Sequence, residues 1–274
     1  MIAIDEAHLC HYWQEFRRAY KDLEKLKSEF LTTPIMALTA TAPPEVLTSM
    51  LKLVRNPVIA KGSMDRPNVK LSCELLSCQA RGDFNEFALR VSEIAGDRCT
   101  VVYANFIESI GPIISELSDL GHSCVGYYGE MDPKSRLESY TKWKSGDAQI
   151  MVATAAFGMG IDHPGIRHVI RYGVPENLCS WVQEFGRAGR DGQPATATCL
   201  YSLSNTDHAG PWIKDNLHNF EFCERILAEY SSAWRFVWAN LVGKCRRQVL
   251  LEAFQDPTTL SNNVSTDVCQ QKST

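Results

Sequence analysis

Two adjacent carboxylates and a histidine are the first residues of the chain that could do chemistry. Asp5, Glu6 and His8 directly follow the apolar run of residues 2–4, which predicts a buried strand. A strand that delivers Asp-Glu at its carboxyl end is typical of nucleoside triphosphatases, in which the pair holds Mg2+ and orients the attacking water. The same pattern also occurs at solvated helix starts, so it indicates this chemistry only together with other motifs.

Two arginines form the second candidate group. Residues 183–192 read QEFGRAGRDG, in which Arg187 and Arg190 are separated by two small residues and flanked by glycines. This spacing can direct both guanidinium groups into one pocket, where an arginine at a γ-phosphate stabilises the charge of the transition state. The alternative is a basic surface helix, which the flanking glycines disfavour.

A glycine-bearing turn lies between these groups. Residues 149–162 (QIMVATAAFGMGID) predict a buried strand that runs into a small-residue turn ending in Asp162. In α/β proteins such turns present backbone groups to a nucleotide at the carboxyl edge of the sheet. Thr39 and Thr41 follow another apolar run, residues 34–38. Four motifs therefore stand in order along the chain.

Together these blocks resemble the RecQ family of superfamily 2 helicases. The matching blocks are DEAH at 5–8, TATA at 39–42, DRPN at 65–68, VATAAFGMGID at 152–162 and QEFGRAGRDG at 183–192. The last two are the specific ones, because they differ from the corresponding blocks of DEAD-box and DEAH-box RNA helicases. The resemblance covers residues 1–205 and implies an enzyme that couples ATP hydrolysis to 3'-to-5' unwinding of duplex DNA in repair and recombination, with single-stranded and forked DNA as its partners.

The resemblance also implies roles for the carboxylates and the arginines. Asp5 would hold the Mg2+ of bound ATP, Glu6 would orient or deprotonate the hydrolytic water, and His8 would link the pair to the opposite lobe. Arg190 is the first choice for the arginine finger, with Arg187 beside it on the phosphates.

Five further residues complete the implied site. Gln183 would bridge to the phosphates, and Gly160 and Asp162 would lie at the interlobe face near the ribose and the magnesium. Thr39 and Thr41 would relay the state of the nucleotide to the DNA side. ATP and Mg2+ are the implied cofactors.

An aromatic-rich segment follows the DEAH block. Residues 9–20 read LCHYWQEFRRAY, in which Trp13 and Phe16 could stack on unpaired bases and Arg17 could hold a phosphate. The segment resembles the loop by which RecQ proteins couple DNA contact to ATP hydrolysis. The alternative is an amphipathic helix that buries Trp13, Phe16 and Tyr20 at helical spacing.

The chain departs from the family pattern at three places. Only two residues separate Trp13 from Phe16, where the family has three. Residues 103–106 (YANF) lack the family's basic residue, and residues 127–130 (YYGE) lack its histidine. Each of the last two changes removes a contact to the DNA backbone, which predicts a weaker grip on the strand.

The phosphate-binding loop G-x-x-x-x-G-K-S/T does not occur in the 274 residues. Without its lysine and amides the β- and γ-phosphates are not neutralised, so we expect the 274-residue polypeptide alone to have no useful ATPase activity, whereas its parent protein has it. Met1 lies inside an apolar strand, which makes it an unexpected start for a functional protein. Two alternatives are a truncated, non-catalytic module that binds DNA or a partner, and a superfamily 2 RNA helicase.

Composition limits the partners and the compartment. With 28 Lys and Arg against 32 Asp and Glu, the chain has no global basic field, so contacts to DNA must be local. Ten scattered cysteines, with no signal peptide ahead of them, predict reduced thiols in an intracellular protein that is not secreted. The resemblance to RecQ helicases implies a nuclear location if the source is eukaryotic. No apolar run is long enough to cross a membrane, and nothing in the sequence predicts an oligomeric state.

A zinc site is not expected. Residues 244–254 (KCRRQVLLEAF) resemble the opening of the RecQ zinc region, where the cysteine is one of four ligands. After Cys245 only Cys269 follows, without a histidine or a CxxC pair. We therefore expect Cys245 to be a thiol without a metal-binding role.

Alternation of strand-like and helical patterns predicts an α/β fold with parallel sheets covered on both faces. The predicted strands are 1–4, 34–39, 58–61, 99–104, 124–128, 149–154, 168–172 and 196–202. The expected domains are an incomplete first RecA-like lobe (1–62), an interlobe linker (63–70), a complete RecA-like second lobe (71–209), the helical start of a zinc region (210–255) and a disordered tail (256–274). In the helical part, one packing face is predicted to contain Ile226, Leu227, Tyr230, Trp234, Val237, Trp238 and Leu241.

Overall fold

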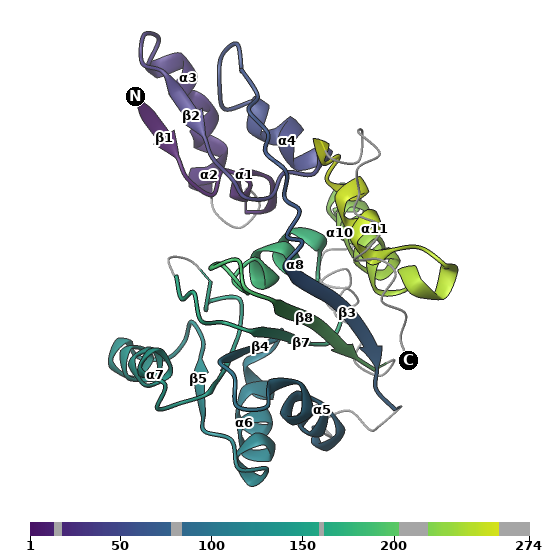
Figure 1. The fold of residues 1–274 in the computed structure, drawn as a ribbon. Helices are drawn as coiled ribbons and strands as arrows, with labels where there is room; N and C mark the ends of the chain where they lie inside the picture. Colours follow the sequence, from purple (N-terminus) through teal and green to yellow (C-terminus); the bar gives the residue numbers. More distant parts are fainter. Residues whose placement is uncertain (14–17, 78–83, 159–161, 203–218, 258–274) are drawn as a thin grey trace. The chain divides into compact units, whose positions relative to one another are not determined.

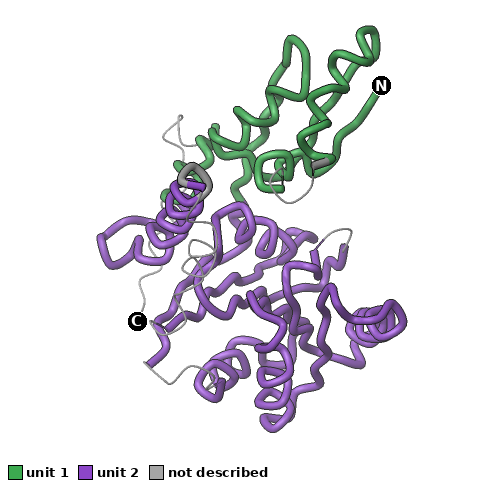
Figure 2. The backbone as a smooth tube through the Cα atoms, turned by 180° about the vertical axis from the view of Figure 1, so that it is seen from behind, with its two compact units in different colours: residues 1–65, 248–266 green, residues 66–247, 267–274 purple. Residues whose placement is uncertain are grey.

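The computed structural model describes residues 1–13, 18–77, 84–158, 162–202 and 219–257 (Figure 1). The chain divides into two compact units (Figure 2). Unit 1 combines residues 1–65 with the stretch that begins at Gln248, and unit 2 comprises residues 66–247. Both units are built on parallel sheets with helices between the strands, which confirms the predicted fold class.

Unit 1 contains a two-stranded parallel sheet in which Ile2 lies opposite Ile35 and Ile4 opposite Ala37. Its strands and N-terminal helices are β1 (Ile2–Ile4), α1 (Leu9–Tyr12), α2 (Arg18–Asp22), η1 (Leu23–Lys25), α3 (Leu26–Glu29), β2 (Ile35–Ala37) and α4 (Pro44–Leu51). A small core of Ala7, Cys10, Val46, Met50 and Leu53 joins α1 and α4 to the sheet. This sheet holds the DEAH block at the end of one strand and the TATA block at the end of its neighbour.

The predicted strand at residues 58–61 is wrong. The described backbone from residue 57 to residue 66 is neither helix nor strand, and the side chains of Val58 and Ile59 are 95 % and 55 % exposed. An apolar run becomes a strand only if a neighbouring strand pairs with it and a core covers one of its faces.

Unit 2 contains a six-stranded, all-parallel sheet in the order β3-β8-β7-β4-β6-β5. The strands are β3 (Val69–Leu75), β4 (Thr100–Ala104), β5 (Cys124–Tyr127), β6 (Ile150–Ala153), β7 (His168–Tyr172) and β8 (Ala195–Tyr201). β3 was not among the predicted strands, although Val69, Leu71, Cys73 and Leu75 alternate with polar residues as in a half-buried strand.

Helices cover both faces of this sheet. They are α5 (Asn85–Ala95), η2 (Ile107–Ser109), α6 (Ile110–Asp119), α7 (Pro133–Ser145) and α8 (Leu178–Phe185). Val102 and Ala104 pack with α5 and α6 in the main core, and α8 lies on the opposite side of the sheet (Figure 1). Because side chains alternate along a strand, Val101 and Tyr103 face the α8 side. Complete burial of a large apolar side chain stabilises the folded state by about 1.5–3 kcal/mol. The core therefore holds the strands of unit 2, and the loops at their ends, in place.

The C-terminal helices are α10 (Phe220–Val237), η4 (Ala239–Val242) and α11 (Arg246–Ala253). The predicted packing face is partly wrong, because Leu227, Trp238 and Leu241 are 50 %, 42 % and 78 % exposed. Val237 is buried as predicted, together with Cys223, Ala233 and Phe236, which the prediction did not include. The helix is therefore rotated so that Phe236 meets Trp181 of α8, with ring centroids 6.3 Å apart.

Among the described residues, seven cysteines form no disulfide, namely Cys10, Cys73, Cys99, Cys124, Cys179, Cys199 and Cys223. Cys245 is disulfide-bonded, so the expectation of a free thiol is wrong at this position. Cysteine spacing along a chain does not show which thiols the fold brings together, and this pairing was therefore not predictable. Within the described part of the chain, no helix is long and apolar enough to cross a membrane.

Candidate functional site

The carboxyl ends of β1 and β2 bring the DEAH and TATA blocks together. The amide of Ala7 donates to the carbonyl of Leu38 at 2.8 Å, and the amide of Leu38 donates to the carbonyl of Ile4 at 2.9 Å. These bonds extend the ladder beyond the strands. Asp5, which follows β1, is exposed, whereas Thr41, which follows β2, is only 1 % exposed.

Glu6 adopts a left-handed backbone conformation with φ 48°. Its amide donates to the Asp5 carboxylate at 2.9 Å, and its carbonyl accepts from the amide of Leu9 at 2.9 Å. A non-glycine residue in this region is strained by about 1–2 kcal/mol. The turn therefore places the two carboxylates side by side at an energetic cost, which is typical of functional positions.

His8 connects the two blocks through its side chain. The hydroxyl of Thr39 donates to the carbonyl of Thr41 and accepts from its amide, both at 3.0 Å. Since the only proton of this hydroxyl is used, Nδ1 of His8 must be the donor across the 2.9 Å contact to Thr39 Oγ1. The same Nδ1 lies 3.3 Å from a carboxylate oxygen of Glu6. His8 is therefore the Nδ1–H tautomer, poised between a catalytic-type carboxylate and the TATA block.

Burial lowers the pKa of His8 from 6.5 to about 4, although the charge of Asp5 opposes the shift. The folded protein therefore keeps this ring neutral near neutral pH. The contact of His8 with the TATA block, which lies in the same unit, is therefore a hydrogen bond and not an ion pair. The link from His8 to the opposite lobe stays a prediction.

This pKa predicts an acid-sensitive unit 1. Between pH 6.5 and about 4 the unfolded chain takes up a proton at His8 that the folded chain does not bind, so stability falls as the pH falls. Because one pKa unit corresponds to about 1.4 kcal/mol, the loss reaches about 3 kcal/mol. Urea unfolding of the wild type and of His8→Gln at pH 7 and pH 4.5 measures it. A difference between the two proteins that does not change with pH would contradict this prediction.

The residues present fit a magnesium ion that is shared with a nucleotide. Among the described residues, no group of three or more His, Cys, Asp or Glu side chains is arranged to hold a metal. Mg2+ in nucleotide sites is commonly held by one or two carboxylates plus phosphate oxygens, so the exposed carboxylate of Asp5 suits this mode.

The second candidate group lies in unit 2, on the loop that follows α8. We call residues 186–193 the arginine loop. The side chain of Asn177 caps the start of α8 by accepting from the amide of Ser180 at 2.8 Å, and the helix ends at Phe185. Residues 186–192 form turns, which confirms that the glycine-flanked arginines do not continue a regular helix.

The arginine loop brings together several of the predicted site residues. A guanidinium nitrogen of Arg190 lies 2.7 Å from a carboxylate oxygen of Asp162. Arg187 approaches the backbone of the glycine-bearing turn so closely that a Cβ at Gly158 would lie 3.2 Å from its Nη2. Gln183 lies on α8, one helical turn before Arg187.

A buried polar cluster behind the arginine loop was not predicted. The guanidinium of Arg171, on β7, bonds to the carboxylate of Glu184 on α8 and to the side-chain oxygen of Asn105 after β4. The side chains of Arg171 and Glu184 are only 3 % and 6 % exposed. The signal in the sequence was an arginine inside the otherwise apolar strand of residues 168–172. This arginine lies beside Asn105, but it is buried and paired with Glu184, so it does not replace the DNA-contacting basic residue that the block at 103–106 lacks.

Burial raises the pKa of the Glu184 carboxyl above its ordinary value, and the charge of Arg171 opposes this shift. Arg187 and Glu184 both act electrostatically on the buried hydroxyl of Tyr103. That hydroxyl donates to the carbonyl of Phe157 at 2.7 Å. The polar cluster, the glycine-bearing turn and the arginine loop are therefore parts of one packed region of unit 2.

The aromatic-rich segment is described in part. Trp13 follows α1 and meets Tyr20 edge-on, with ring centroids 5.7 Å apart. Both rings are half-buried, and Tyr20 packs against the core of unit 1. Phe16, Arg17 and Gly160 lie outside the described residues. Stacking of Trp13 on a base stays a prediction.

Comparison with known proteins agrees with this geometry. Residues 84–192 match the family model "Helicase conserved C-terminal domain". The chain is 31 % identical to the ATP-dependent helicase wrn-1 of Caenorhabditis elegans (99 % of this chain, 26 % of the relative). It is 29 % identical to the ATP-dependent DNA helicase Q-like 2 of Arabidopsis thaliana (96 % and 37 %). A relative from Acanthamoeba polyphaga mimivirus that is named an ATP-dependent RNA helicase is 31 % identical (94 % and 46 %).

Among solved structures, Saccharomyces cerevisiae Dbp5 bound to RNA and ADP BeF3 aligns with a TM-score of 0.61 at 16 % identity, over 77 % of this chain and 56 % of that one. This likeness shows the RecA-like helicase fold. The chain spans less than half the length of the curated relatives it matches. Its motifs, its parallel sheets and its relatives together show that the chain belongs to the RecQ-like helicases of superfamily 2.

Proposed function

We propose that the protein to which these residues belong is an ATP-dependent DNA helicase that moves 3'-to-5'. The observation that carries the proposal is the arginine loop, which holds Arg190 beside Asp162 and Arg187 against the glycine-bearing turn. Relatives whose names include DNA helicase support DNA as the nucleic acid. Single-stranded and forked DNA are the proposed substrates, and the nucleus is the proposed location in a eukaryote.

Unit 1 contributes the groups that act on water. Asp5 would hold the Mg2+ of bound ATP, and Glu6 would orient or deprotonate the hydrolytic water. His8 keeps Glu6 in register with Thr39 through its Nδ1–H. Bound Mg2+ supplies neutralisation of phosphate charge. Thr39 and Thr41 are the proposed relay from nucleotide to DNA, because one hydrogen-bonded chain runs from His8 to Thr41.

Unit 2 contributes positive charge. Arg190 is the proposed arginine finger, and its pairing with Asp162 holds it extended until a phosphate competes for it. Arg187 is the second phosphate-binding group, with Gln183 beside it on α8. Asp162 and Gly160 are proposed to lie near the ribose.

Nucleic-acid-stimulated phosphate release tests this function. We expect ATP hydrolysis by the protein to be stimulated by single-stranded DNA, and a forked duplex with a 3' tail to be unwound. The mimivirus relative makes RNA the second candidate, and stronger stimulation by RNA than by DNA of equal length would support it. No hydrolysis with either nucleic acid would refute the proposal.

The 274-residue polypeptide on its own is expected to bind single-stranded DNA without turning over ATP. It contains no G-x-x-x-x-G-K-S/T loop, so the phosphates lack their main anchor. Phosphate release by the purified polypeptide should therefore equal the no-protein background, with and without DNA. Turnover at an ordinary helicase rate would contradict this expectation. If the polypeptide does not bind single-stranded DNA even at low salt, the hypothesis that it is a non-catalytic DNA-binding module is refuted.

A further inference from the structure

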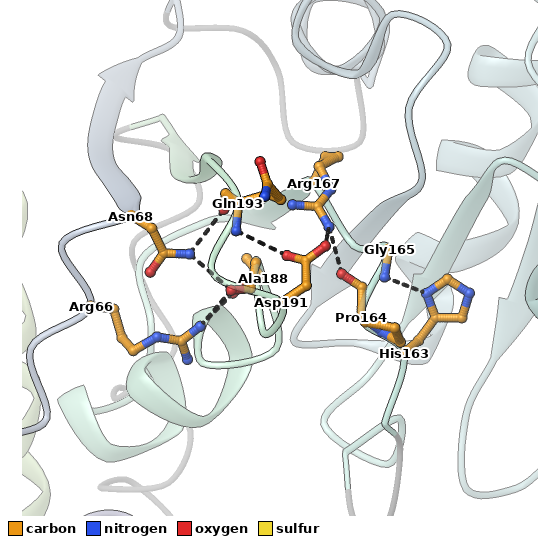
Figure 3. A network of polar contacts seen from close by, with 10 residues as sticks. Arg66, Asn68, His163, Pro164, Gly165, Arg167, Ala188, Asp191 and Gln193 are labelled. Atoms are coloured by element: carbon orange, nitrogen blue, oxygen red, sulfur yellow. Dashed lines mark hydrogen bonds and ion pairs between the residues drawn. The ribbon is translucent and has the colours of Figure 1, made fainter.

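Two side chains just before β3 reach the arginine loop (Figure 3). Nη1 of Arg66 donates to the carbonyl of Gly186 at 3.1 Å, and its Nη2 donates to the carbonyls of Ala188 and Gly189, both at 3.0 Å. Nδ2 of Asn68 donates to the carbonyls of Gly189 at 2.8 Å and Gln193 at 2.9 Å. Five of the donor contacts that the loop receives therefore come from one short segment.

These donors serve carbonyls of the loop, which lie past the last residue of α8. The carbonyls of Glu184 and Phe185 at the end of the helix accept instead from the amides of Arg187 and Ala188. A planar guanidinium presents its donors in a fixed fork, so Arg66 can set the relative positions of several carbonyls at once. An ammonium group could not impose the same geometry.

The contact of Asn68 leaves no room for a side chain on the loop. Gly189 has φ 58°, and a Cβ there would lie 2.6 Å from Asn68 Nδ2 and 2.8 Å from the carbonyl oxygen of Gln193. The main chain of Asn68 is held as well, because its carbonyl accepts from the amide of Ala195 at 2.9 Å. The side chain of Asn68 can therefore make these hydrogen bonds only because residue 189 is glycine.

The segment that carries these donors is itself anchored. Arg247, which is only 6 % exposed, donates to the carbonyl of Arg66 at 3.0 Å and to that of Val69 at 2.5 Å. Burial and the neighbouring charge of Arg190 lower the pKa of Arg66, which shows how close this cation lies to the proposed finger. The positive charges of Arg66 and Arg190 repel each other, so the hydrogen bonds that Arg66 donates must outweigh this repulsion.

We propose that Arg66 and Asn68 are positioning residues that hold the arginine loop in the shape that presents Arg187 and Arg190. The inference rests on the proposed function of those arginines, but its structural part does not require ATP hydrolysis. It assigns the DRPN block at 65–68 the task of preorganising the loop before a nucleotide arrives.

Hydrogen exchange of the 274-residue chain tests the structural part. The amides of Ala188, Gly189 and Gly192 bond within unit 2, so a peptide covering residues 183–193 reports local opening of the loop. We expect Arg66→Ala and Asn68→Ala to speed its exchange by about ten- to a hundredfold, the effect of losing charge-assisted or paired hydrogen bonds. A peptide covering β4 should be unchanged, which excludes global unfolding.

Two further variants separate hydrogen bonding from packing. Asn68→Asp keeps the shape of the side chain but replaces the donor by a carboxylate that faces two carbonyl oxygens. It should therefore speed exchange more than Asn68→Ala. Arg235→Ala is the matched control, because Arg235 is exposed on α10, outside the arginine loop and its donors, and the substitution should leave exchange unchanged. If Asn68→Asp and Arg66→Ala exchange as slowly as the wild type, the proposal is overturned.

Steady-state kinetics of the ATP-hydrolysing protein test the functional part of the proposal. If Arg66 acts through the loop, Arg66→Ala lowers kcat about tenfold, with Arg66→Lys between it and the wild type. Added to Arg190→Ala, it should lower kcat by clearly less than tenfold, because one of the two groups that it positions is already absent. Additive losses would overturn the positioning role. If the wild type hydrolyses no ATP, the proposed function fails while the exchange data still decide the structural part.

Discussion

Replacing Arg190 by alanine is expected to lower kcat for ATP hydrolysis by about a thousandfold or more. An arginine finger stabilises charge on the transferred phosphoryl group mainly in the transition state, so its removal lowers kcat with little change in KM for ATP. Binding of single-stranded DNA should change little. Steady-state phosphate release, together with fluorescence anisotropy of labelled DNA, measures the two effects separately.

Asp162→Asn is the companion variant for Arg190. It removes the charge that pairs with Arg190 at 2.7 Å but keeps the shape of the side chain. The pair is partly exposed, with 37 % and 78 % of the two side chains accessible, so its loss should change stability by less than about 1 kcal/mol. A loss of kcat in Asp162→Asn as large as that in Arg190→Ala would argue against Arg190 as the finger.

Removing the buried carboxylate of Glu184 is expected to destabilise unit 2 by about 3–5 kcal/mol. Glu184→Ala leaves the guanidinium of Arg171 in the interior without its counter-charge, and such an uncompensated charge is strongly unfavourable. Arg171→Met should cost less, because a buried carboxyl can take up a proton whereas a guanidinium cannot lose one. Urea unfolding monitored by tryptophan fluorescence measures both.

Two controls define the origin of this effect. The double variant Arg171→Met with Glu184→Leu should recover most of the lost stability, because it replaces the ion pair by apolar side chains of similar size. Glu138→Ala, on the exposed surface of α7, should change stability by no more than about 0.5 kcal/mol. If Glu184→Ala and Glu138→Ala behave alike, the buried pair does not stabilise unit 2.

Much of the architecture was predictable because the motifs lie at strand ends. Seven of the predicted strands are present, because the sequences of buried parallel strands are short, mostly apolar runs. No strand was predicted at β3, because it is an edge strand in which polar residues alternate with the apolar ones instead of a continuous apolar run. The run at 58–61 was overpredicted because apolar residues alone do not provide a pairing partner.

The chemistry at the site was predictable only at the level of residue type. The sequence placed Asp5, Glu6 and the two loop arginines in a helicase pattern, and the structure shows where they lie in each unit. It could not indicate that His8 donates from Nδ1, because that follows from the hydroxyl of Thr39. Nor could it show that Arg66 reaches residues more than a hundred positions away.

The left-handed conformation of Glu6 has a consequence for mutational scanning. At φ 48° glycine or asparagine would be less strained than glutamate, so Glu6→Gly should fold at least as well as the wild type. A library sorted for folded protein would then enrich substitutions at position 6 that a library sorted for unwinding eliminates. Comparing the two selections would show that glutamate at position 6 is required for activity although it strains the backbone.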